Sequence, residues 1–215
     1  MKKILFLSLL SVLAFSGCYK PEIGVWDELV IKEGKHRAKP YDLTWNDNVN
    51  IAYRWQFTES CQYDLENSNQ CDWNKLTGYT FNFTTSHKNS LMVAWRWDLS
   101  GYWWVSPYYH LDGHVKWADA SCSGQEIEEL TVDPNLVPLA IYPGQEFETH
   151  FTIRSDLKVC IVTIIVPETG STTYFELALP EEDSFGNTRE IYPWFGGSQT
   201  APHEMTIRRL LIDSE

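Results

Sequence analysis

Four side chains between residues 75 and 110 have types that together could move a proton beside a bound anion. Lys75 and Arg96 are cations, while Tyr108 and His110 carry a phenol and an imidazole. A cation can neutralise a carboxylate, and a phenol or imidazole can then transfer a proton next to it. We therefore treat these four as candidate catalytic residues. The alternative that the residues leave open is a polar sheet face whose side chains only pack across strands.

Period-two alternation predicts the strands that would position these side chains. Tyr108 and His110 are two residues apart, so both lie on one face of a strand. The dipeptides Ser100-Gly101 and Asp112-Gly113 are typical of hairpin turns and predict a meander of strands over 90–98, 102–111 and 114–118. Arg96 lies opposite an apolar stripe on its strand. If these strands are neighbours, Arg96, Tyr108 and His110 converge with Lys75 from the preceding turn.

Alternation elsewhere predicts an all-β chain. Strands are expected over 49–57, 147–154, 158–166, 172–179 and 205–212, and no stretch after the N-terminal segment has helical periodicity. Residues 157–166 form a nearly continuous apolar run, which predicts a central strand covered on both faces. About nine or ten strands with Gly and Pro between them favour a single-domain antiparallel β-sandwich, most simply a concanavalin-like jelly roll.

A series of short motifs in a fixed order resembles the jelly-roll polysaccharide lyases of the alginate and glucuronan type. The motifs are Asp72 to Gly78, Asn89-Ser90 leading to Ala94-Trp95-Arg96, Pro107 to His110, and Trp194-Phe195-Gly196-Gly197 leading to Ala201-Pro202-His203. The resemblance spans about residues 72–212 and implies β-elimination on a uronate polymer. Lys75 and Tyr108 match the family by type. Met92 stands where the family has an arginine, and Thr77 replaces a proline.

Aromatic residues are dense in the predicted meander and suggest a sugar-binding face. Eight of the 23 residues from 95 to 117 are aromatic, more than one buried face needs. Alternation turns Trp95, Trp97 and one of Trp103 and Trp104 inward, which leaves a large ring facing outward. Exposed rings stack on the C–H faces of sugars. We name as candidate ligand-binding residues Arg54, Trp103, Trp104 and Tyr109. Core packing and edge cover are the alternative.

Charge ranks the possible functions. The formal net charge of −12 repels phosphate backbones, so we do not expect a nucleic-acid partner. The same charge disfavours an anionic substrate and therefore the lyase. We expect a concave sheet that binds a neutral or weakly charged polysaccharide or glycan, with the lyase as second hypothesis and a structural or adhesive protein as third.

The N-terminus has the features of an export signal. Lys2 and Lys3 precede an apolar stretch that is too short to span a bilayer, and Ser16-Gly17-Cys18 resembles the bacterial lipobox. We expect residues 1–17 to be a lipoprotein signal peptide, Cys18 to carry lipid, residues 18–24 to be a tether and residues 25–215 to be the sandwich. Tyr19 favours the outer membrane, with the domain facing the periplasm or the cell surface. A secretory signal cut nearby is the alternative.

The other four cysteines are an even number in an oxidising compartment, which predicts two disulfides. We favour Cys61–Cys71, which would order the polar loop 62–70, and Cys122–Cys160, although free thiols are an alternative. No CxxC spacing is present and the histidines at 110 and 114 flank a turn, so neither a transition-metal site nor another cofactor is expected. A structural calcium ion is left open.

Overall fold

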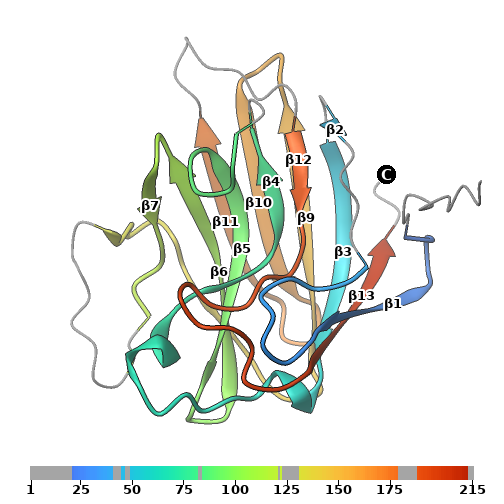
Figure 1. Ribbon diagram of the computed structural model, residues 1–215. Coiled ribbons are helices and arrows are strands. Elements are labelled where there is room, and N and C mark those ends of the chain that lie inside the picture. The colour runs from blue at the N-terminus through green and yellow to red at the C-terminus, as the bar shows by residue number, and fades with distance from the viewer. Residues whose placement is uncertain are drawn as a thin grey trace, which may run out of the picture.

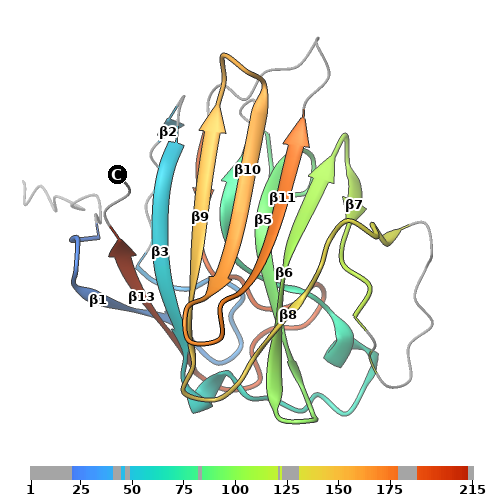
Figure 2. The same ribbon diagram turned by 180° about the vertical axis from the view of Figure 1, so that it is seen from behind.

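The computed structural model is a sandwich of two antiparallel β-sheets, which confirms the jelly-roll prediction (Figures 1 and 2). It describes residues 21–40, 45–46, 49–81, 84–120, 122, 131–178 and 188–212. The six-stranded sheet has the order β1 (Trp26–Ile31), β13 (Met205–Ile212), β3 (Val49–Phe57), β9 (Glu146–Arg154), β10 (Val159–Val166) and β11 (Ser171–Ala178).

The second sheet carries the candidate site. Its strand order is β2 (Trp45–Asn46), β12 (Thr188–Ile191), β4 (Asn74–Thr80), β5 (Ser90–Asp98), β6 (Tyr102–Leu111) and β7 (His114–Lys116), and β8 (Leu139–Ile141) pairs with β6. The only helices in the described part of the chain are two 3-10 turns, Glu59–Cys61 and Ser68–Cys71. No helix in that part is long and apolar enough to cross a membrane.

The predicted meander is confirmed as β5, β6 and β7. Asp112 and Gly113 both have positive φ angles, 50° and 81°, which is the backbone that a two-residue hairpin turn needs to follow the strand twist. The prediction for β10 was wrong in one respect. Its alternate residues, such as Val162 and Ile164, are buried, while the residues between them are partly exposed, so only one face of this strand is covered.

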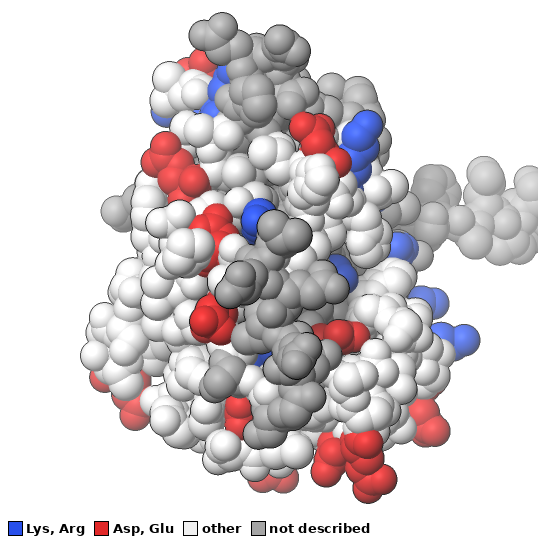
Figure 3. All heavy atoms as spheres, turned by 90° about the vertical axis from the view of Figure 1, so that its left-hand side faces the viewer, with Lys and Arg blue, Asp and Glu red and all other residues white. Residues whose placement is uncertain are grey.

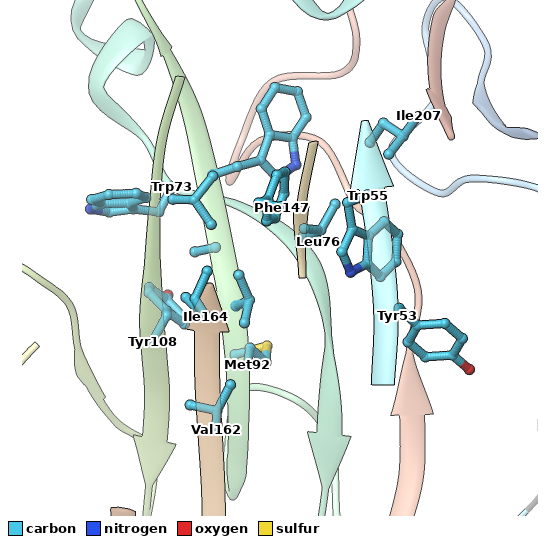
Figure 4. Packing of buried hydrophobic residues seen from close by; sticks show 14 of the residues in the cluster. Tyr53, Trp55, Trp73, Leu76, Met92, Tyr108, Phe147, Val162, Ile164 and Ile207 are labelled. Atoms are coloured by element: carbon cyan, nitrogen blue, oxygen red, sulfur yellow. The ribbon is translucent and has the colours of Figure 1, made fainter. Parts of the chain in front are cut away.

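The core fills the space between the sheets with aromatic rings from both. Phe57 of β3 packs against Trp95, Trp103 and Phe147, with ring centroids 5.0, 5.1 and 5.4 Å away. Figure 4 shows Trp55 and Phe147 beside Leu76 of β4 in the same layer. Because Trp95 and Trp103 point inward, the residues that alternate with them on β5 and β6 must point away from the core.

The prediction of two disulfides among the four cysteines other than Cys18 was wrong both in their number and in their pairing. Cys71 is bonded to Cys122, which lies 51 residues further along the chain, while Cys61 and Cys160 are free, buried thiols. The loop 62–70 does not need a Cys61–Cys71 bridge because Gln70 orders it. The Gln70 amide accepts from Leu65 N at 2.9 Å and donates to the carbonyls of Tyr63 and Trp97 at 3.2 and 3.1 Å.

Cys18 and the expected signal peptide, residues 1–17, lie outside the described residues. Lipid attachment and membrane location therefore remain predictions.

Candidate functional site

The outer face of β5 and β6 brings two of the candidate residues together. In the antiparallel register Met92 is opposite Tyr108 and Ser90 is opposite His110. Tyr108 and His110 are two residues apart on β6 and lie on the face of the strand opposite to Trp103. The Tyr108 hydroxyl lies 3.2 Å from Nε2 of His110, within hydrogen-bond distance. Both side chains are only 6% exposed.

Lys75 of β4 reaches the same place from the side. Its Nζ lies 5.9 Å from the centre of the Tyr108 ring, and its side chain is also 6% exposed. The exposed His87 lies beside His110, with the two ring centres 5.5 Å apart. The structure thus brings together three of the four candidate catalytic residues that were predicted to converge, namely Lys75, Tyr108 and His110.

Burial shifts the proton affinity of each of these groups. Burial, together with the neighbouring His87 and Lys75, lowers the pKa of His110 from 6.5 to about 4, so the ring is neutral near pH 7. Burial also raises the pKa of Tyr108, which keeps its phenol protonated. The pKa of Lys75 is lowered by burial, but the carboxylate of Asp72 opposes the shift. A neutral imidazole can accept a hydrogen bond from the protonated phenol.

A turn far along the chain fixes the position of Lys75. The main chains of Lys75 and Trp194 donate to each other at 2.9 Å in both directions. One residue earlier, the Asn74 side chain accepts from Gly196 N at 2.5 Å. The Gly197 amide donates to Asp72, whose Oδ2 would lie 3.2 Å from any Cβ added at Gly197. The Trp-Phe-Gly-Gly segment therefore holds the start of β4.

Lys75 also lines an open cleft of about 250 Å³. Arg189 of β12 and Arg37 contribute two further cations, and the guanidinium of Arg37 lies 5.5 Å from the centre of the Trp194 ring. The remaining lining residues are Thr80, Thr85, Ser86, His87, Glu190, Ile191 and Tyr192. Three cations therefore gather in one cleft of a chain whose net charge is −12. Elsewhere, acidic side chains predominate over the lower half of the face seen in Figure 3.

Arg96 does not join Lys75, Tyr108 and His110. Its guanidinium donates to the carbonyls of Cys71 and Ala120 at 3.0 and 2.5 Å and lies 4.8 Å from the centre of the Trp73 ring. One of these carbonyls belongs to a cysteine of the Cys71–Cys122 bridge, and the other lies two residues before its partner cysteine. Arg96 thus holds the segment around Ala120 against the outer face of the sheet, and its 4% exposure leaves little surface for a ligand.

The four candidate ligand-binding residues lie outside the cleft. Trp103, which is 1% exposed, is part of the core. Tyr109 also faces inward, where it stacks on Phe175. Arg54 is on the six-stranded sheet and donates to Glu148 at 2.8 Å. Trp104 is partly exposed and faces outward, but it stands at the other end of β6.

Sequence reasoning missed the cleft residues Arg37, Arg189 and Trp194 as members of a site. Arg189 lies on β12, a four-residue strand too short to show alternation, and Arg37 lies in a loop. The resemblance had singled out the segment that begins at Trp194, but nothing local to these residues places them beside Lys75. No group of three or more potential metal-ligating side chains occurs among the described residues.

Comparisons with known proteins leave the function open. No family model and no curated protein matches this sequence. Among solved structures, alginate lyase vAL-1 from Chlorella virus has a TM-score of 0.44 at 11% identity, over 86% of this chain and 81% of its own. Winged bean acidic lectin, complexed with methyl-alpha-D-galactose, scores 0.42 at 9% identity over 91% and 97%. SCP-B, of the Eqolisin family of peptidases, scores 0.38 at 10% identity over 86% and 62%. Scores this low, spread over a lyase, a lectin and a peptidase, support no function in particular.

Proposed function

We propose that this protein binds a polysaccharide, and that the cleft between β4, β12 and Trp194 takes an acidic one. The observation that carries the proposal is the convergence of Arg37, Lys75 and Arg189 on one cleft. The sequence alone favoured a neutral or weakly charged glycan because the net charge is negative. A local cluster of cations outweighs that average, since charges within one cleft act over distances shorter than the Debye length.

The composition of the cleft suits a sugar acid better than a bare anion. Trp194 is partly exposed, with His36 stacked on one face of its ring at 5.0 Å, and two threonines and a serine also line the cleft. An aromatic ring can stack on the C–H face of a pyranose while guanidinium groups bind its carboxylate in a bidentate manner. The cleft thus offers both kinds of contact that a uronate residue needs.

Binding is tested by calorimetric titration with hexamers of mannuronate, guluronate and glucuronate. At least one should bind, and Arg189→Gln and Arg37→Gln should each weaken it about tenfold, as expected for loss of a charge-assisted contact of 1.4 kcal/mol or more. Arg154→Gln is the matched control, because Arg154 pairs with Asp156 on the other sheet. If none of the three hexamers binds, or the control weakens binding equally, the proposal fails.

A lyase is the second candidate, and the contact between Tyr108 and His110 favours it. In β-elimination a cation neutralises the uronate carboxylate, a base removes the C5 proton, a C4–C5 double bond forms and the C4–O bond breaks. Lys75, whose Nζ lies 5.9 Å from the centre of the Tyr108 ring, would supply that cation. Tyr108 and His110 would remove the C5 proton and protonate the departing oxygen.

Two observations place binding ahead of catalysis. Met92 is fully buried at the position where the lyase resemblance expects an arginine. Tyr108 and His110 do not line the cleft themselves, and it is their neighbours Lys75 and His87 that do so.

The lyase is tested by following the absorbance of unsaturated uronates with the same three acidic polymers as substrates. Tyr108→Phe should abolish product formation, whereas Tyr109→Phe should retain it, because Tyr109 faces the opposite side of the same strand. Binding without any product from the wild-type protein excludes the lyase and leaves the binding proposal standing.

For location, we propose that Cys18 is lipidated and anchors the domain to the outer membrane. The lipobox-like Ser16-Gly17-Cys18 after an apolar stretch supports this. Metabolic labelling with an alkyne fatty acid should mark the wild-type protein but not Cys18→Ser. Labelling of both proteins, or of neither, would rule the anchor out.

A further inference from the structure

We propose a second carbohydrate-binding surface at the far end of β5 and β6, one that takes a neutral sugar. The surface, here called the distal patch, consists of Asp98, Tyr102, Trp104, Ala140 and Tyr142. It shares no residue with the cleft and does not rest on the function proposed for the cleft.

Strand register places the members of the distal patch on one face. Asp98 is opposite Tyr102 between β5 and β6, and Trp104 is opposite Ala140 between β6 and β8. Trp103 of the same strand is in the core, so Tyr102 and Trp104 on either side of it face outward. Tyr142 follows β8 and packs against Tyr102, with ring centroids 5.7 Å apart.

The rings form a supported platform. Tyr102 meets Trp104 edge to face at 5.0 Å, and the Trp104 indole N–H donates to Asp98 Oδ2 at 3.3 Å. Asp98 also accepts from Ser100 N at 2.8 Å, which fixes its carboxylate in the hairpin turn. Tyr142 is 53% exposed, and Ala140, which is opposite Trp104, has a side chain too small to cover that ring. Rigid rings of this kind lose little conformational entropy when a ligand stacks on them.

The charge and ring spacing of the distal patch select the ligand. Asp98 is its one charged member, and it would repel a uronate or a sulfate, whereas it can accept hydrogen bonds from sugar hydroxyls. An aromatic cage for a cation needs rings that stand apart around a space, but these rings pack directly on one another. A neutral pyranose, with an apolar C–H face and hydroxyl donors at its rim, fits both features.

Arg96 separates the distal patch from the cleft. It is opposite Trp104 on β5, and the carbonyl that it binds at Ala120 belongs to a segment lying over the sheet between the two surfaces. The two surfaces are therefore expected to bind independently, the cleft an acidic glycan and the distal patch a neutral one.

Calorimetric titration with cellohexaose, mannohexaose and laminarihexaose tests the distal patch. At least one should bind the wild-type protein, and Tyr142→Ala and Trp104→Ala should each weaken binding about tenfold or more, as truncation of aromatic anchors does. Tyr174→Ala is the matched control, because Tyr174 is also 53% exposed but lies on the six-stranded sheet. Arg189→Gln should leave this binding unchanged.

Several results would overturn the proposal. These are no binding of any of the three neutral hexaoses, an equal loss in Tyr174→Ala, or binding of tetramethylammonium chloride in their place. Self-association that Tyr142→Ala abolishes, seen by light scattering in the absence of sugar, would assign the patch to a second copy of the chain instead. Tyr142→Ala removes an exposed side chain, so its thermal unfolding should match the wild type and separate lost binding from lost folding.

Discussion

The backbone of Gly196 lies against the carbonyl oxygen of Gln199, and a Cβ atom at position 196 would overlap that oxygen. Gly196 also has a φ of 67°, which favours glycine. Because Gly196 N donates to Asn74, next to Lys75, this tight turn and the cleft are mechanically linked.

We therefore expect Gly196→Ala to lower the free energy of unfolding by about 3 kcal/mol, the sum of left-handed backbone strain and overpacking. Gly144→Ala is the control. Gly144 has a φ of 87° with nothing within 4 Å, so only the strain of about 1 kcal/mol should remain. Urea unfolding measures both. Equal losses in the two variants would show that the contact with Gln199 does not matter.

The disulfide gives a second prediction. Peptide mapping without reduction should find Cys71 linked to Cys122, and native protein should not react with iodoacetamide at Cys61 or Cys160. Burial raises the pKa of Cys61 to about 12 and also raises that of Cys160, so neither thiol ionises near pH 7. In denaturant Cys61 and Cys160 should both react. Closure of a loop of this size is worth about 4 kcal/mol, which Cys71→Ser should remove.

Residues with a strict alternating pattern could be placed from the sequence, because the pattern is itself the physical cause of the strand. The predicted strand over 90–98 and the shared face of Tyr108 and His110 follow directly from this alternation, which did not decide whether Trp103 or Trp104 faces outward. The disulfide could not be found in this way. Its pairing depends on how Gln70 and Arg96 fold two separate loops onto the sheet.

The cleft was unpredictable for a related reason. Arg37, Lys75 and Arg189 come from a loop and from two strands that are adjacent in the sheet but far apart in the chain. Net charge is an average over the whole chain and gives no information about such local clusters. The negative average therefore pointed toward a neutral ligand, although the charges in the cleft favour an acidic one.

His110 predicts how stability depends on pH. Its pKa is about 4 when folded and about 6.5 when unfolded, so the unfolded chain binds the proton more tightly. The resulting stability is fully present above pH 6.5 and is lost as the pH falls toward 4. Between pH 7 and pH 5 the loss from this group should be on the order of 2 kcal/mol.

Urea unfolding of the wild type and His110→Asn at pH 7 and pH 5 isolates this effect. The variant lacks the titrating ring, so its loss of stability over the same interval should be smaller than that of the wild type. His114→Asn, which changes an exposed histidine at the end of the same hairpin, should behave like the wild type. Identical losses in all three proteins would contradict the assignment to His110.

The last prediction concerns a charge buried between the sheets. Arg209 of β13 is 0% exposed, and its guanidinium lies 3.0 Å from Glu190 of β12 and 3.7 Å from Asp27 of β1. Glu190 and the cleft residue Arg189 are neighbours on β12, so this ion pair ties the strand that lines the cleft to the other sheet.

Arg209→Met should lower the free energy of unfolding by about 3–5 kcal/mol, because two partly buried carboxylates lose their cation. Arg209→Met combined with Glu190→Gln should recover part of this loss in urea unfolding, since one of those charges is then gone. A double variant no more stable than Arg209→Met alone would mean that packing around Tyr53 and Tyr192, rather than charge, accounts for the stability that Arg209 provides.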